Sequence, residues 1–226
     1  MSSGDEVQAA INGRIDEIIN NDSAPDLVRE FYRPENAFAG ESFELLGRAD
    51  DDVHKFVPAD FLAITLMGVS VPPDSLRRIL GADSGRLNGM LEKVGDDVDL
   101  WKADDAKLDA AESLFHELVE QYAGIKEVVA GKLLARKRPK LIAIVDEVVV
   151  KAIAAPPKKY WVSYKSALQD GCRLQRIRDL RPHDLNPRIA DLRILDTAIW
   201  MSHSEGKAAR RARERTGYPP PSPSYR

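Results

Sequence analysis

The sequence predicts an all-α fold, a multi-helix globular domain, on three observations. Apolar residues recur every three or four positions along most of the 226-residue chain, which places them on one face of a helix. Proline and glycine residues fall where such segments would begin and end. Hydrophobic residues make up 43% and charged residues 31%, as in ordinary folded proteins. The length suits one domain with a substantial core, or two small lobes around one cleft.

The first part of the chain, residues 1–57, is expected to form N-terminal helices and a loop. An apolar stripe predicts a helix over residues 6–20. A second helix is predicted over residues 24–32, with Pro25 in its first turn. Residues 35–56 mix aromatic residues with Gly and Asp, which favours a loop with an embedded short helix.

Residues 58–204 are expected to form the helical core. Helices are predicted over residues 58–69, from Pro73 to Gly81, over residues 83–94 and from about 104 to 122. Between the last two, the loop GDDVDLW (residues 95–101) carries three aspartates. It lacks the glycine and glutamate that a calcium loop requires, so we expect a solvated loop and no metal.

A candidate functional site lies in residues 122–150, YAGIKEVVAGKLLARKRPKLIAIVDEVVV. This stretch combines a turn glycine, a basic helix and an isolated carboxylate. Gly124 is placed to end one helix, and a second helix follows at once until Pro139 stops it. The first-turn amides of that second helix would be unpaired and suited to phosphate. Between Gly124 and Lys140 the sequence has six basic residues and one acidic residue, Glu127, so the local positive charge would also favour a phosphate ligand. The basic residues are Lys126, Lys132, Arg136, Lys137, Arg138 and Lys140.

Asp146 interrupts an apolar run just before another apolar helix. Two interpretations are open. Aspartate is a common helix N-cap, which needs no further role. Alternatively, the carboxylate lies at the mouth of a cleft, held by the apolar wall behind it.

The pattern resembles the helix-hairpin-helix DNA glycosylase superfamily, whose members place a catalytic Asp at the start of the helix after the hairpin. Gly124 and Ile125 match the start of the hairpin turn, and Ala130 matches an alanine of the following helix. Asp146 lies 22 residues after Gly124. The resemblance implies a glycosylase-like fold with the hairpin at about residues 110–136, DNA as partner, and Asp146 as the catalytic residue.

The chain also departs from that superfamily. Lys126 replaces the second glycine of the turn, and Val129 replaces the usual threonine. Val128 stands where bifunctional members carry a Schiff-base lysine, which implies a monofunctional enzyme unless Lys132 takes that role. A closer similarity is to an uncharacterised bacterial family of unknown function that shares GKLLARKRP and DVDLW. It covers about residues 60–201 and implies no activity.

Basic and aromatic residues follow Pro156 and Pro157. Tyr160 and Trp161 could form the wall of a substrate pocket that stacks on exposed bases, or could be the buried side of a helix. We favour the packing interpretation. The last core helix is predicted around Ile189 to Trp200, and residues 205–226 are predicted to be a basic arm and a disordered tail.

Composition excludes several classes of site. Cys172 is the sole cysteine, and the four histidines are scattered, so no metal and no cofactor are expected. No apolar run reaches the length of a membrane span, and the first residues, MSSGDEVQAA, lack the features of a signal peptide. We therefore expect a cytoplasmic protein without membrane contact.

The net charge of −3 conceals an asymmetry. Residues 1–123 hold 11 Lys and Arg against 26 Asp and Glu, whereas residues 124–226 hold 22 against 10. We consider three hypotheses. The first is a DNA-binding protein, which would be a glycosylase using Asp146 if it is an enzyme. The second is a non-catalytic nucleic-acid- or protein-binding module, and the third is an interaction protein whose acidic half binds a basic partner or mimics nucleic acid.

Overall fold

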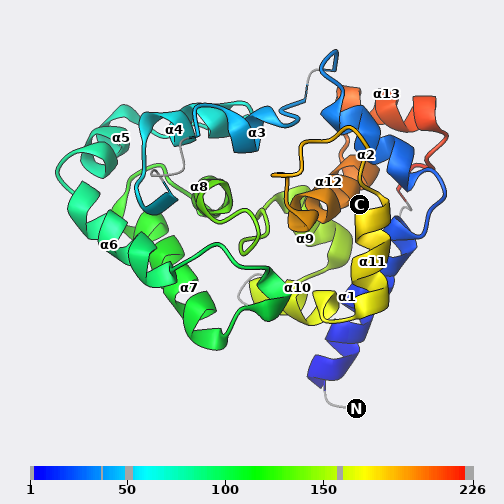
Figure 1. Ribbon diagram of the computed structural model, residues 1–226, viewed down its shortest axis with the longest axis horizontal. Helices are drawn as coiled ribbons and strands as arrows, with labels where there is room; N and C mark the ends of the chain where they lie inside the picture. The colour runs from blue at the N-terminus through cyan, green and yellow to red at the C-terminus, as the bar shows by residue number, and fades with distance from the viewer. Residues whose placement is uncertain (1–2, 37, 49–52, 157–159, 222–226) are drawn as a thin grey trace. The chain divides into compact units, whose positions relative to one another are not determined.

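The computed structural model describes residues 3–36, 38–48, 53–156 and 160–221 (Figure 1). The all-α prediction is confirmed, because the described residues form thirteen α-helices and short 3-10 turns. The chain folds as two compact units. We call residues 41–145 the central unit, and residues 1–40 together with 146–226 the terminal unit. These boundaries differ from those expected at residues 57 and 204.

The central unit is built around one buried helix, α8 (Glu127–Lys137). Its other helices are α3 (Ser42–Leu45), α4 (Pro58–Thr65), α5 (Pro73–Leu80), α6 (Ser84–Val94) and α7 (Asp105–Gln121). Every residue of α8 from Val129 to Lys137 is buried, and the helix packs on α4 and α7. Gly131 permits close approach, since a Cβ there would lie 2.8 Å from the Val145 Cβ.

The cations of α8 bind the C-terminal carbonyls of neighbouring helices. Lys132 Nζ donates to the carbonyl of Met67, just after α4, at 3.0 Å. Arg136 donates to the carbonyls of Phe43 and Leu46, at the end of α3, at 2.6 Å each. Carbonyls in the last turn of a helix lack partners within the helix and carry partial negative charge. These side chains therefore complete helices that end inside the unit.

Arg138 does the same for α6. Its guanidinium donates to the Leu91 carbonyl at 3.0 Å and to the Gly95 carbonyl at 2.7 Å, and it also donates to the Val53 carbonyl. Only 1% of Arg138 is exposed. One side chain thus joins the end of α6 to the segment that precedes α4.

A buried ion pair connects α8 to the start of α4. Lys137 Nζ lies 2.7 Å from Asp60 Oδ2, and the same oxygen accepts the Val57 N–H at the α4 N-terminus. Burial lowers the pKa of Lys137, and the charge of Asp60 partly offsets this. Arg136 Nε lies 3.4 Å from the other Asp60 oxygen, so the buried carboxylate offsets the charge of two buried cations.

The terminal unit is built around α12 (Asp191–His203), of which ten residues are buried. Helices α1 (Ser3–Ile19), α2 (Ala24–Tyr32), α9 (Glu147–Ile153), α11 (Gly171–Asp179) and α13 (Lys207–Thr216) pack against it. Helix α10 (Tyr160–Leu168) packs on α1 and α11. Segments from both ends of the sequence therefore share one core.

The expected basic arm is a docked helix. Ala209 and Ala212 of α13 are buried with Leu27 and Met201, and Tyr218 packs against this cluster. Arg213 donates to the Met201 and Ser204 carbonyls at the end of α12, at 2.7 and 2.9 Å. The expected disordered tail falls partly on residues 222–226, which lie outside the described residues.

Replacing Arg138 should destabilise the protein strongly. Arg138→Met leaves the carbonyls of Leu91, Gly95 and Val53 without their donor. We expect the free energy of unfolding to fall by about 2–4 kcal/mol in urea denaturation. Lys140→Met is the control, because Lys140 is exposed and should change stability by less than about 0.5 kcal/mol. Similar losses in both variants would contradict the structural role assigned to Arg138.

Glu30 should make the terminal unit sensitive to acid. Burial raises its pKa, but hydrogen bonds from Arg215 and Asn36 and the charges of Arg215 and Arg33 outweigh this, and the pKa falls below 4.5. The stabilisation is therefore fully present above pH 4.5 and is lost as pH falls through the lower, folded-state value. In denaturation curves from pH 7 to pH 3, the wild type should exceed Glu30→Gln in stability at pH 7. The difference should shrink on acidification, and a constant difference would contradict this assignment.

Candidate functional site

The turn between α7 and α8 is exposed and requires glycine. Gly124 has a φ of +79°, in the left-handed region. A Cβ there would lie 2.4 Å from Pro72 Cγ. Gly124 and Lys126 are exposed, whereas the side chains of Tyr122 and Ile125 point into the unit and are 1% and 2% exposed.

The first turn of α8 leaves backbone donors open. Val129 and Ala130 both donate their N–H groups to the Lys126 carbonyl at 3.0 Å. The N–H groups of Glu127 and Val128 come earlier and have no acceptor within the helix. Lys126, the N-cap residue, supplies no side-chain cap. An anion could accept from these amides, although the exposed Glu127 carboxylate stands in the same turn.

Helices α5 and α6 fix the turn in place. Tyr122 donates its hydroxyl to Asp83 at 3.0 Å, and Arg78 lies 4.7 Å from the centre of the Tyr122 ring. Burial, and then the hydrogen bond and charge of Asp83, raise the pKa of Tyr122 to about 12. Ser75 Oγ donates to the Ala123 carbonyl at 2.8 Å. Side chains of α5 and the N-cap residue of α6 thus hold the two residues that precede Gly124.

Four of the six basic residues that we expected to favour a phosphate ligand are buried in the structure. Lys132, Arg136, Lys137 and Arg138 are 4%, 1%, 4% and 1% exposed. They bind carbonyls or Asp60 inside the central unit, as described above. Among the six basic residues noted in the sequence, Lys126 and Lys140 are the two that are exposed.

Asp146 is the N-cap of α9. Its Oδ1 accepts the Val148 N–H at 2.9 Å, and the residue is partly buried. The capping interpretation therefore holds. Asp146 begins the second segment of the terminal unit and Gly124 belongs to the central unit. That they face one groove stays a prediction.

Tyr160 and Trp161 lie in α10, 3% and 4% exposed, inside the terminal unit. This agrees with the packing interpretation. The Tyr160 and Tyr164 rings are 5.0 Å apart. Burial, then the negative charge of Asp196, raise the pKa of Tyr160 well above 10, and the charge of Asp146 adds to this. Asp146 and Tyr160, predicted from different motifs, therefore act on each other electrostatically.

Sequence reasoning missed the charged pair beneath these residues. Arg193 and Asp196 in α12 are 2% and 4% exposed, with Arg193 Nη1 2.9 Å from Asp196 Oδ2. The available signal was Asp196 itself, the one charged residue in the mostly apolar run from Ile194 to Trp200, three residues after an arginine. At that spacing two helical side chains are neighbours.

The aspartate loop has a structural role. Asp97 Oδ1 accepts the Lys140 N–H at 2.9 Å, and burial raises the Asp97 pKa while that hydrogen bond lowers it. Leu100 anchors the loop with no exposed surface. Among the residues that the structure describes, no three His, Cys, Asp or Glu side chains are grouped to hold a metal ion.

The fold and site define an all-α protein with a buried helix at the centre of each unit and an exposed turn between α7 and α8. The chain belongs to a family of unknown function, DUF6308, whose model matches residues 24–203. This confirms the resemblance to an uncharacterised family and adds no support for a glycosylase. No curated protein and no solved structure matches the chain.

No helix in the described part of the chain combines the length and apolar character needed to cross a bilayer.

Substitutions at Asp146 should separate its cap from its charge. Asparagine caps helices as well as aspartate does, whereas alanine does not. We expect Asp146→Ala to lower the free energy of unfolding by about 1 kcal/mol and Asp146→Asn to change it by less than about 0.5 kcal/mol. Urea denaturation at pH 7 measures both. A large loss in Asp146→Asn would mean that the fold needs the charge.

Proposed function

We propose that the chain binds the phosphate backbone of DNA through the turn between α7 and α8. The observation that carries this proposal is the exposed, glycine-dependent turn with open amides at Glu127 and Val128 and an exposed cation at Lys126. Helix N-terminal amides favour phosphate oxygens, and the turn needs no rearrangement to present them. The contact is independent of base sequence.

The charge of the central unit limits the size of this contact. Residues 41–145 hold 19 Asp and Glu against 14 Lys and Arg, a net charge of −5, and four of the cations are buried. Long-range attraction to DNA from this unit is therefore weak or absent. Binding depends on short-range contacts to one or two phosphates.

The finer proposal is catalysis by a monofunctional, glycosylase-like hydrolase. It rests on the sequence resemblance and on the electrostatics around Asp146. The charges of Asp196, Arg193 and Asp146 all act on Tyr160. A carboxylate such as Asp146 would stabilise the positive charge that develops on a sugar as its glycosidic bond breaks, and it could also activate water. Asp146 is the member of the set nearest to solvent.

A second function is favoured by the negative charge of the central unit. Acidic residues of α7, including Asp105, Asp109 and Glu120, are exposed. They would attract a basic protein partner rather than DNA. The two functions differ in the sign of the ligand's charge, so one titration distinguishes them.

Duplex DNA binding should depend on Lys126. With a labelled duplex titrated from about 20 to 200 mM salt, the log-log slope should lie between about −1 and −2, as expected for one or two phosphates. Lys126→Glu should weaken binding about tenfold or more, because it replaces a phosphate contact by repulsion.

Lys93→Glu is the matched control. It makes the same charge change in the same unit, at an exposed position two helical turns along α6 from Arg86, which contacts Tyr122. Its effect should stay below about twofold. Equal weakening by both variants, or a slope near zero with tight binding of a polylysine peptide, would overturn the proposal and favour the basic partner.

Catalysis is tested on duplexes with damaged bases, where Asp146→Asn should keep binding and lose base release.

A further inference from the structure

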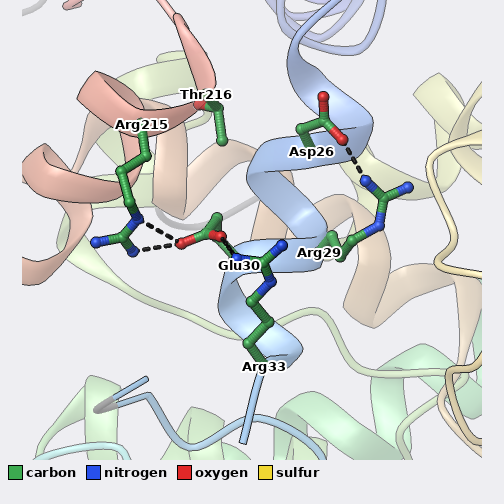
Figure 2. Close-up of a pocket in the computed structure, with 6 residues that line it drawn as sticks. All are labelled: Asp26, Arg29, Glu30, Arg33, Arg215 and Thr216. Carbon is green, nitrogen blue, oxygen red and sulfur yellow. Dashed lines mark hydrogen bonds and ion pairs between the residues drawn. The ribbon is translucent and has the colours of Figure 1, made fainter. Parts of the chain in front are cut away.

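The terminal unit contains a pocket that none of the preceding functions uses. It lies between α2 and α13 and has a volume of about 470 Å³. The lining residues are Asp26, Arg29, Glu30, Arg33, Arg215 and Thr216 (Figure 2). Three arginines from two helices thus surround one depression.

A buried carboxylate positions two of these arginines. The Glu30 side chain is 6% exposed, and its carboxylate lies between the guanidinium groups of Arg33 and Arg215 (Figure 2). Arg33 Nη1 is 2.6 Å from one oxygen, and Arg215 donates Nε at 2.9 Å and Nη2 to the other. Both arginine side chains remain about half exposed, at 54% and 49%. Glu30 therefore fixes the orientation of both guanidinium groups, and about half of each arginine side chain remains exposed to solvent.

The arginines keep donors for a ligand. A guanidinium has five N–H groups, and Glu30 accepts from one edge of each of its two partners. Arg29 pairs with Asp26 at the rim, where both side chains are about half exposed, so water and salt weaken this pair. Three positive charges face two negative charges, a net charge of +1. The pocket favours an anion.

We infer that this pocket binds a phosphate group, held by Arg29, Arg33 and Arg215, with Glu30 as a positioning residue. Planar guanidinium groups approaching from different helices suit the several oxygens of a phosphate, each of which accepts charge-assisted hydrogen bonds. A small phosphate ester and a nucleic-acid strand would present the same group. The pocket belongs to the terminal unit and does not rest on the proposed DNA contact at Gly124.

The test measures binding of inorganic pyrophosphate to the full chain by calorimetry at about 20 mM salt. Arg29→Gln/Arg33→Gln should weaken binding about tenfold or more, because two charge-assisted contacts are lost. Arg210→Gln/Arg211→Gln removes the same charge from exposed positions of α13 that do not line the pocket. This control should change binding by less than about twofold. A parallel titration uses a thymidine oligonucleotide without terminal phosphates.

The outcomes are distinct. If the chain binds pyrophosphate but not the oligonucleotide, and Arg29→Gln/Arg33→Gln loses that binding, the pocket is a site for small phosphate compounds. If the chain binds both ligands and this variant loses both equally, the pocket binds the phosphates of a nucleic-acid strand. No pyrophosphate binding at millimolar concentration, or the same loss in both double variants, overturns the inference. Arg29→Gln by itself keeps the test valid if the double variant misfolds, since the described partner of Arg29 is the exposed Asp26. It should weaken binding several-fold.

Discussion

The structure depends on cations that complete the C-terminal ends of helices. Short helices that stop inside a protein leave carbonyl groups without partners, and burying such groups is costly. In the central unit Lys132 and Arg136 of α8, and Arg138 at the C-cap of that helix, donate to these carbonyls. Burying a cation is costly as well, so the arrangement is stable only because each donor finds acceptors. This makes α8 the element that the other helices of the unit require.

The same interaction recurs elsewhere in both units. Arg78 donates to the Gln121 carbonyl at the end of α7, Arg173 to the Ala167 carbonyl in α10, and Arg213 to the end of α12. Basic residues are thus used inside the protein for structure. The formal charge of a segment is therefore a poor guide to its surface, and the positive charge noted after Gly124 is largely interior in the central unit. A DNA contact at the turn must rely on backbone amides and Lys126.

The elements were predictable from the sequence because their signals are local. Residues 24–32 form a helix as predicted, Gly124 takes the predicted left-handed conformation three residues after α7 ends, and Pro139 follows the end of α8. The burial of Arg136 was not predicted, because its acceptors lie about 90 residues away in the sequence. Yet a clue was present: three consecutive cations at 136–138 point to different sides of a helix and leave no separate polar face. The unit boundaries also depend on such distant contacts.

The candidate site follows the same division between local and distant information. A cap such as Asp146 is readable from sequence, but asparagine would cap α9 equally well. The carboxylate adds a negative charge near Tyr160 and the buried Asp196, which opposes the ionisation of Tyr160. Arg193, 2.9 Å from Asp196, acts in the opposite direction. The cap was therefore predictable from local sequence, whereas the effect of Asp146 on Tyr160 depends on how the terminal unit packs.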